Sequence, residues 1–207
     1  MSLLKAISRH GFDHPEHIAL EGSGKKLTYG ELPNIIQELA AELSRRGVRT
    51  LGMDLDNGLE WALVDLAALT AGIRLVPIPP FFSPSQIRHC LSQAQVDAVV
   101  SDQPARLMER AGDLLGAPGA PLIVVDAVCA WLPGKAVRKD EGAGAAKITY
   151  TSGTTGEPRG VILDWERIGP VVDSLCTVLS VGPGDRHVAL TPMAVLLENI
   201  CGLYAPL

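Results

Sequence analysis

Residues 51–79 read LGMDLDNGLEWALVDLAALTAGIRLVPIP, and this stretch is the clearest indication of the fold class. Residues 51–55 form a short apolar run typical of a strand. Residues 60–71 are apolar on nearly every side, which predicts a buried helix. Residues 75–79 predict a second strand, ended by prolines that cannot donate to a sheet ladder. The stretch therefore predicts a strand, a helix and a second strand in succession.

The same alternation continues on both sides of this unit. Upstream, two strands at 18–21 and 26–29 flank a Gly-Ser-Gly turn, and an apolar helix face follows and ends at Gly47. Downstream, Ser83 can cap a helix that Pro84 opens. The pattern then predicts a strand at 96–100, a helix at 104–115 and a strand at 122–125. This order predicts an α/β fold of layered, mainly parallel sheets with flanking helices.

Composition excludes several classes of protein. The 207 residues include 18 Lys and Arg against 23 Asp and Glu, and a net charge of -5 argues against general affinity for nucleic acid or anionic lipid. The chain has no uninterrupted apolar segment of the roughly 18 residues that a membrane span needs, and its start does not read as a signal peptide. We therefore expect a cytoplasmic protein. The four cysteines, at 90, 129, 176 and 201, are far apart and are predicted to be reduced core thiols.

A second stretch carries the chemistry, because residues 147–161 read KITYTSGTTGEPRGV. Glycines let a backbone turn tightly and aim its N–H groups at one spot, and hydroxyls add donors or metal ligands. The guanidinium of Arg159 suits phosphate oxygens. The spacing fits neither the common P-loop nor a dinucleotide fingerprint. The predicted phosphate-binding residues are Thr151, Ser152, Gly153, Thr154, Thr155, Gly156 and Arg159. The alternative is a polar hairpin turn between two strands.

Residues 150–161 resemble the signature Tyr-Thr-Ser-Gly-Thr-Thr-Gly-x-Pro-Lys-Gly-Val of the adenylate-forming enzymes, with Arg159 where Lys is usual. That superfamily includes acyl-CoA synthetases, peptide-synthetase adenylation domains and luciferases. Three weaker family patterns support the resemblance, at 27–32 (LTYGEL), 69–78 (LTAGIRLVPI) and 192–198 (PMAVLLE). The resemblance covers about residues 15–207. Among the members of the superfamily, the chain most resembles the fatty-acid-CoA ligases.

The resemblance implies a two-step reaction. A carboxylate attacks the α-phosphate of ATP and releases pyrophosphate, and the acyl group then passes to coenzyme A or to the phosphopantetheine of a carrier protein. It also implies that Thr151 helps to hold Mg²⁺. Val195 stands where the family often has His near the acid substrate, and Glu198 lies in the same region. Trp165 takes the place of another frequent family His.

Family enzymes are more than twice as long as this chain, and the chain contains no Tyr-Gly-x-Thr-Glu. The chain is therefore expected to be a fragment of the N-terminal AMP-binding domain, with a possible internal boundary in the linker 134–146 and no C-terminal domain. No catalytic residue is assigned within it, and the fragment alone is expected to be inactive. Exposed apolar surface would favour a dimer or aggregation. Two alternatives stay open: a non-catalytic nucleotide-binding or interaction lobe, and an adenylation domain that loads an amino or aryl acid onto a carrier protein.

Other polar residues have simpler explanations. His10, His14 and His17 could share a helix face and bind zinc, but Gly11 and Pro15 are expected to break that helix and leave a solvated segment. His89 and His187 are expected at or near the surface, and Ser174 and Cys176 lack a neighbouring base for nucleophilic catalysis. Asp54 and Asp56 are expected to face solvent. Glu198 is expected to be partly buried, with a packing or capping role.

Overall fold

The computed structural model describes residues 3–116, 118–122, 125, 127–131, 146–151, 157–182 and 184–207. A two-stranded antiparallel ribbon, β1 (Ile18–Gly22) and β2 (Lys25–Thr28), precedes a seven-stranded sheet of order β6-β7-β5-β3-β4-β8-β9. The strands of that sheet are β3 (Thr50–Asp54), β4 (Arg74–Pro77), β5 (Ala98–Ser101), β6 (Pro118–Pro121), β7 (Val128–Trp131), β8 (Ala146–Thr151) and β9 (Arg159–Asp164). The helices are α1 (Leu3–Asp13), α2 (Leu32–Arg45), α3 (Leu59–Ala71), α4 (Pro84–Gln93), α5 (Pro104–Ala111), α6 (Trp165–Leu179), α7 (Leu196–Asn199) and the π-helix η1 (Ile200–Tyr204).

The centre of the large sheet is parallel. β3 pairs in parallel with β4 and with β5, and β4 pairs in parallel with β8. Antiparallel strands extend both sides, since β7 joins β5, β6 joins β7 and β9 joins β8. The prediction of an α/β fold with flanking helices is confirmed, and the sheet is parallel at its centre and mixed as a whole.

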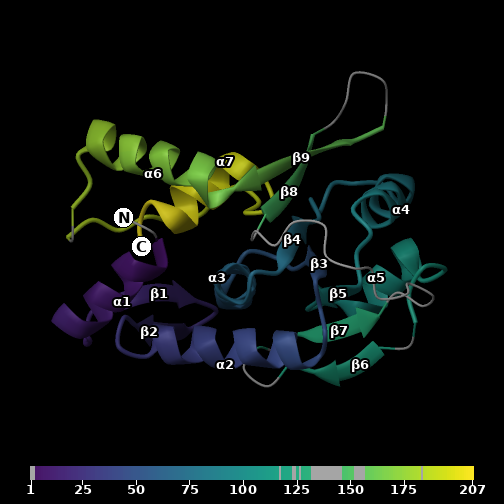
Figure 1. Ribbon diagram of the computed structural model, residues 1–207, viewed down its shortest axis with the longest axis horizontal. Helices are drawn as coiled ribbons and strands as arrows, with labels where there is room; N and C mark the ends of the chain where they lie inside the picture. The colour runs from purple at the N-terminus through teal and green to yellow at the C-terminus, as the bar shows by residue number, and fades with distance from the viewer. Residues whose placement is uncertain are drawn as a thin grey trace.

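Helices cover both faces of this sheet, and each face has its own apolar core. In β3 and β4, Leu51, Met53 and Leu75 belong to a core with α1, α2, α3, α6 and η1. Val76 and Val99 point to the other face and pack with α4 and α5. This alternation follows from the two-residue period of a strand. In Figure 1, α6 and the α7–η1 segment lie at the top of the view, and α2 lies at the bottom.

Local sequence signals set several element boundaries as predicted. The hydroxyl of Ser83 accepts a hydrogen bond from the amide of Gln86, and the Gln86 side chain accepts one from the Ser83 amide, so the two form a capping box at the start of α4. Gly47, just beyond α2, has φ 73°, a left-handed conformation that suits glycine. α3 is buried on almost every side.

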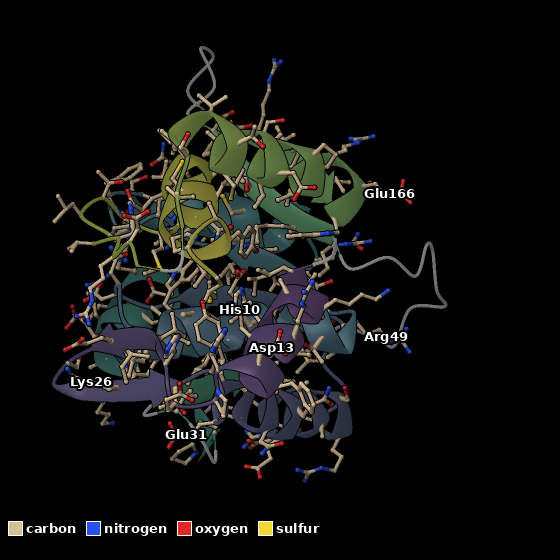
Figure 2. All side chains as sticks on the ribbon, turned by 90° about the vertical axis from the view of Figure 1, so that its left-hand side faces the viewer. His10, Asp13, Lys26, Glu31, Arg49 and Glu166 are labelled. Atoms are coloured by element: carbon tan, nitrogen blue, oxygen red, sulfur yellow. The ribbon has the colours of Figure 1, made fainter. Side chains whose placement is uncertain are left out.

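The residues 27–32, which resemble a family segment, join β2 to α2. The amide and the hydroxyl of Thr28 both donate to the Glu31 carboxylate at 2.8 Å, and the Glu31 amide donates back to the Thr28 hydroxyl at 3.3 Å. These hydrogen bonds lower the pKa of the Glu31 carboxyl. Figure 2 shows Glu31 and Lys26 at the outer surface of this end of the molecule, away from Glu166 at the start of α6. The segment is a structural junction.

Two expectations about secondary structure were wrong. Of the predicted strand at 122–125, the described residues Leu122 and Val125 lie outside any strand, between the antiparallel strands β6 and β7, and the amide of Leu122 donates to the carbonyl of Ala127 at 3.0 Å. Both side chains are buried there, so their apolar character reflects burial and not a strand. Near the N-terminus, Gly11 does not break the helix, because α1 runs on to Asp13.

Gly11 is needed for a close approach between α1 and the chain after β2. A Cβ at this position would lie 2.6 Å from the backbone oxygen of Tyr29. We therefore expect Gly11→Ala to lower the free energy of unfolding by about 1–3 kcal/mol, because the helix must shift away from Tyr29. Urea unfolding of the chain measures this. Gly24→Ala is the comparison, since a Cβ there meets nothing within 4 Å and only its φ of +74° costs free energy. A Gly11→Ala variant as stable as wild type would contradict this account.

The outer faces of β9 and α6 expose apolar side chains. Val161, Ile162, Val171, Val178 and Leu179 are all exposed, Val178 by 79%. This surface is consistent with the expected dimer or aggregate, which stays a prediction for light scattering to test. Among the described residues, no helix is both long and apolar enough to cross a membrane.

Candidate functional site

The two described ends of the predicted phosphate loop lie opposite each other. Thr151 ends β8, Arg159 begins β9, and the two are paired in the antiparallel register. Both residues are exposed. The predicted loop residues Ser152, Gly153, Thr154, Thr155 and Gly156 lie outside the described residues. The flanking strands thus form a hairpin, as the alternative reading required, and its two ends bring one hydroxyl and one guanidinium to the same edge of the sheet.

Helix α4 contacts both ends of this hairpin loop. The Tyr150 hydroxyl donates to the carbonyl of Cys90 at 3.3 Å, and burial raises the pKa of Tyr150 to about 12. His89 lies edge-on to the Tyr150 ring, with ring centroids 6.5 Å apart. Nε2 of His89 lies 3.0 Å from the carbonyl oxygen of Pro158, so Nε2 carries the proton and donates it. Nδ1 of His89 is 3.9 Å from the carboxylate of Glu157.

The hydrogen bond between His89 and Pro158 is expected to restrain local opening of the chain around Arg159. His89→Ala removes one neutral hydrogen bond, worth about 1 kcal/mol, so openings of the segment become about fivefold more frequent. We expect tryptic cleavage after Arg159 to quicken by that factor, because cleavage follows the open population. His89→Gln can donate to the same carbonyl and should restore most of the wild-type rate. The exposed Ser92→Ala on the same helix is the control. Equal cleavage rates for His89→Ala and wild type would show that the contact restrains nothing.

An open hollow of about 350 Å³ lies at the carboxyl ends of β3 and β4. In parallel α/β sheets, ligands bind at this end of the strands. The side chain of Asn57, which follows β3, donates to the carbonyl of Thr191 at 2.7 Å and accepts from the amide of Met193 at 2.8 Å. Asn57 therefore fixes the 191–193 segment against the strand ends. The lining residues are Leu55, Asp56, Asn57, Pro80, Leu190, Pro192 and Ala194.

Val195 and Glu198, the two residues expected near the acid substrate, lie just beyond this hollow in the chain. Val195 is half-buried and precedes the first turn of α7. The carboxylate of Glu198 accepts from the hydroxyl of Thr191 at 2.5 Å and lies 3.4 Å from Nε2 of His187. Burial raises the pKa of the Glu198 carboxyl, but the hydrogen bonds from Thr191 and His187 outweigh it and leave that pKa below its usual value. The expected partial burial of Glu198 is confirmed, whereas its packing or capping role stays a prediction.

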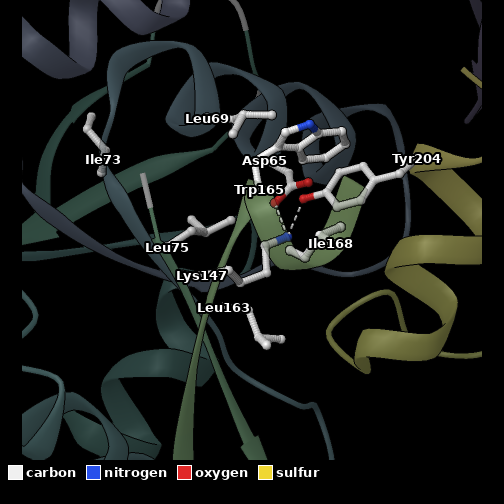
Figure 3. A pocket seen from close by; sticks show the side chains of 9 residues that line it. All are labelled: Asp65, Leu69, Ile73, Leu75, Lys147, Leu163, Trp165, Ile168 and Tyr204. Carbon is white, nitrogen blue, oxygen red and sulfur yellow. Dashed lines mark hydrogen bonds and ion pairs between the residues drawn. The ribbon is translucent and has the colours of Figure 1, made fainter. Parts of the chain in front are cut away.

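A buried charged cluster was not predicted. Lys147 on β8 is 7% exposed, and its ammonium contacts the carboxylate of Asp65 on α3 (Figure 3). It also donates to Oδ1 of Asn199 at 2.6 Å and to the hydroxyl of Tyr204 at 2.7 Å. A signal existed in the sequence, because Asp65 and Lys147 are opposite charges inside two apolar segments, and buried charges are paired.

These sites belong to a chain whose sequence matches a known family. The family model described as "AMP-binding enzyme" matches residues 7–207. The chain belongs to the AMP-binding enzyme family. Tyrocidine synthase 2 of Brevibacillus parabrevis is 30% identical over 181 residues, which cover 83% of this chain and 5% of that protein. The adenylate-forming superfamily predicted from residues 150–161 is therefore confirmed.

Solved structures show the same fold as this chain. A Rhodopseudomonas palustris protein described as a long-chain-fatty-acid CoA ligase aligns with TM-score 0.79 and 18% identity, over 100% of this chain and 55% of that chain. The adenylation domain AlmE of Vibrio cholerae, in complex with glycyl-adenosine-5'-phosphate, aligns with TM-score 0.77 and 15% identity, over 99% of this chain and 43% of that chain. The chain thus spans about half the length of these structures and a small part of Tyrocidine synthase 2.

The burial of Asp54 differs from its prediction. It was expected to face solvent with Asp56, yet it is 3% exposed, while Asp56 is exposed as predicted. Asp54 ends β3 at the carboxyl edge of the parallel sheet, where Nη1 of Arg110 lies 3.5 Å and Nη2 of Arg106 3.9 Å from its carboxylate. Burial raises the pKa of the Asp54 carboxyl, and the two guanidinium groups lower it by less. The prediction was wrong because alternation along a strand fails where helix side chains cover the strand end.

The remaining expectations concern residues with structural roles. His14 and His17 are exposed and stack with centroids 4.8 Å apart; with Glu16 they could offer ligand atoms within 4.8 Å of one another, but they lie in the solvated segment that was predicted. The Ser174 hydroxyl donates to the carbonyl of Pro170, four residues earlier in the same helix.

Cys90 is a buried free thiol, and burial raises its pKa to about 12. Cys176 and Cys201 are free and half-buried.

Proposed function

We propose that this chain is the nucleotide-binding part of an ATP-dependent ligase that activates a carboxylic acid as an acyl-adenylate. A carboxylate oxygen of the acid attacks the α-phosphorus of ATP, the bond from that phosphorus to the bridging oxygen breaks, and pyrophosphate leaves. A thiol then attacks the carbonyl carbon of the acyl-adenylate, the bond from that carbon to the phosphate oxygen breaks, and AMP leaves. The observation that carries the proposal is the pairing of Thr151 with Arg159 across β8 and β9, in a chain of the AMP-binding enzyme family.

The donor groups at this hairpin suit ATP and Mg²⁺. The Thr151 hydroxyl is an oxygen ligand of the kind that Mg²⁺ prefers, and the Arg159 guanidinium matches phosphate oxygens in charge and shape. Both groups are exposed at the sheet edge, so a nucleotide can reach them. Bound Mg²⁺ would neutralise phosphate charge, and Arg159 would hold the departing pyrophosphate oxygens in place. Ser152, Gly153, Thr154, Thr155 and Gly156 are proposed to add hydroxyl and amide donors.

The acid is proposed to bind along the 190–198 segment. The hollow beside it is lined mainly by apolar side chains, and the half-buried Val195 offers no polar group to the substrate. These features favour an apolar, fatty-acid-like acyl group over a polar one. Coenzyme A is then the proposed thiol, as in a fatty-acid-CoA ligase.

A second candidate is an adenylation domain that transfers an amino or aryl acid to a carrier protein. It is favoured by the similarity to Tyrocidine synthase 2 and by the structural likeness to the AlmE adenylation domain. Both candidates share the adenylation step and differ in the acid and in the thiol. A non-catalytic nucleotide-binding or interaction lobe is the third candidate, and it predicts no exchange activity at all.

Pyrophosphate exchange into ATP tests the proposal. The assay uses the full open reading frame that contains residues 1–207, with panels of fatty, aryl and amino acids. Exchange that depends on a fatty acid, followed by thioester formation with coenzyme A, supports the leading proposal. Exchange with an amino or aryl acid and transfer to a phosphopantetheine carrier supports the second candidate. No exchange with any acid overturns both. The 207-residue chain alone is expected to show none above background.

A further inference from the structure

Lys147 is the centre of a hydrogen-bonded cluster that joins three parts of the molecule. Its ammonium has three N–H donors, and the three contacts to Asp65, Asn199 and Tyr204 use all of them. The ammonium also lies 5.4 Å from the ring centroid of Trp61 and 5.0 Å from that of Tyr204. The Asn199 amide donates to the second oxygen of Asp65 at 3.4 Å. The cluster therefore ties α3, β8 and the α7–η1 segment together.

The cluster is poorly explained as a source of stability. Desolvation lowers the pKa of Lys147, although the charge of Asp65 counteracts part of this effect. A buried ion pair can usually be replaced by apolar side chains of similar size without loss of stability, whereas removal of one partner is strongly destabilising. What such a pair can supply is a unique arrangement of the elements it joins.

The local backbone supports a positional role. An α-helix turns about 100° per residue, so residues five apart would point about 140° away from each other. Across η1 the Ala205 amide instead donates to the carbonyl of Ile200 at 2.9 Å, a π-helical hydrogen bond over five residues. This wider turn lets Asn199 and Tyr204 face the same ammonium, as Figure 3 shows for Tyr204.

The elements that Lys147 joins carry the two halves of the proposed site. Thr151 lies four residues further along β8, so its side chain is on the same face of the strand about 13 Å away. Asn199 directly follows Glu198 and ends the short helix that begins after Val195. Movement of Asn199 relative to Lys147 would therefore displace the proposed acid segment from the proposed nucleotide residues.

We propose that Lys147 is a positioning residue that, through its contact with Asn199, sets the distance between the proposed acid-binding segment 190–198 and the nucleotide-binding end of β8. The expected effect of Lys147 on catalysis rests on the proposed function. Its expected effect on the position of the acid-binding segment does not. A misplacement of about 1 Å between reacting groups can cost about 100-fold in rate. Lys147 would thus control the rate of adenylation without touching either substrate.

Two variants separate position from stability. Lys147→Met leaves Asp65 buried and unpaired and should lower the Tm by about 6–20 °C. Lys147→Met with Asp65→Val removes both charges, and the adjoining cavity of about 20 Å³ gives room for the bulkier methyl groups of the valine. We expect this double variant to regain most, but not all, of the Tm that Lys147→Met loses, because the buried side chains of Asn199 and Tyr204 still lose their contacts to the ammonium. Arg46→Met is the matched control, because it removes a cation that contacts the buried Glu42 on α2, away from this cluster.

Amide hydrogen exchange and enzyme kinetics then test whether Lys147 positions the acid-binding segment. In the 207-residue chain, the double variant should exchange amides 199–205 about tenfold or more faster than wild type, whereas an Arg46→Met variant of equal or lower Tm should exchange them like wild type. In the full reading frame, its kcat for pyrophosphate exchange should fall about 100-fold with little change in the KM for ATP. Arg46→Met should lower Tm without either effect. A double variant with wild-type exchange of these amides and wild-type kcat overturns the proposal. If wild type itself shows no pyrophosphate exchange, the proposed function fails, and the amide exchange still decides whether Lys147 holds this segment.

Discussion

Trp61→Ala is expected to lower the free energy of unfolding by about 3–5 kcal/mol, a large part of the about 5–15 kcal/mol that holds an ordinary domain together. Trp61 is 0% exposed and lies in the larger core between α3 and the sheet. Its removal leaves a cavity beside the Lys147 ammonium, whose contact with the indole ring is also lost. Urea unfolding followed by circular dichroism measures the effect.

Two further substitutions make the Trp61 result interpretable. The indole nitrogen of Trp61 is buried with no hydrogen-bond partner among the described residues, so Trp61→Phe loses no hydrogen bond and should cost clearly less than Trp61→Ala. Leu179→Ala removes an exposed side chain and should change the free energy of unfolding by less than about 0.5 kcal/mol. A loss below about 1 kcal/mol for Trp61→Ala would mean that the packing around α3 is not as described.

Thr151→Ala is expected to reduce pyrophosphate exchange by about 100- to 1,000-fold in the full reading frame, the range for loss of one group that stabilises a transition state. The hydroxyl is exposed at the end of β8, opposite Arg159, where the proposed Mg²⁺ and phosphates bind. Stability should hardly change, because an exposed residue at a strand end packs against little. Steady-state exchange at several Mg²⁺ concentrations measures the effect.

Thr177→Ala is the control for Thr151, since it removes another exposed hydroxyl, one that only donates to the carbonyl of Asp173 within α6. Its activity should equal that of wild type. Arg159→Lys keeps the charge and should reduce exchange only mildly, whereas Arg159→Ala should weaken it strongly. If Thr151→Ala exchanges at the wild-type rate and responds to Mg²⁺ like wild type, Thr151 does not take part in metal binding.

The parallel centre of the fold followed from the sequence, because β3, α3 and β4 each carry a strong local pattern. The same holds for α4, whose Ser83–Pro84 start is a local signal. Of the strands at the sheet edges, β9 was foreseen only in the alternative reading of residues 147–161, and β6 was not foreseen. β9 contains Arg159 and Gly160 and exposes Val161 and Ile162, so it lacks the alternation of a half-buried strand. β6 begins and ends with proline, which counts against a strand except at a sheet edge, where β6 lies.

The site was predictable only where its residues are neighbours in sequence. Thr151 and Arg159 lie in one motif, and the structure places them opposite each other. The contact between His89 and Pro158 joins positions 69 residues apart, and that between Lys147 and Asp65 joins positions 82 apart. No local pattern encodes such pairs, since they depend on which strands become neighbours. Asp54 shows the same limit, because helix α5 and not its own strand determines its burial.

The strand order also bears on how the protein is made. β8 lies beside β4 in the sheet, but β4 ends at Pro77 and β8 begins only at Ala146. At about 5–20 residues per second, a ribosome needs roughly 3 to 14 seconds to synthesise the intervening chain. During that interval the nascent sheet exposes the backbone groups of β4 as an open edge, the feature through which chains aggregate. Slower translation between codons 78 and 146 should therefore lower the yield of folded protein, and a chaperone that shields strand edges should restore it.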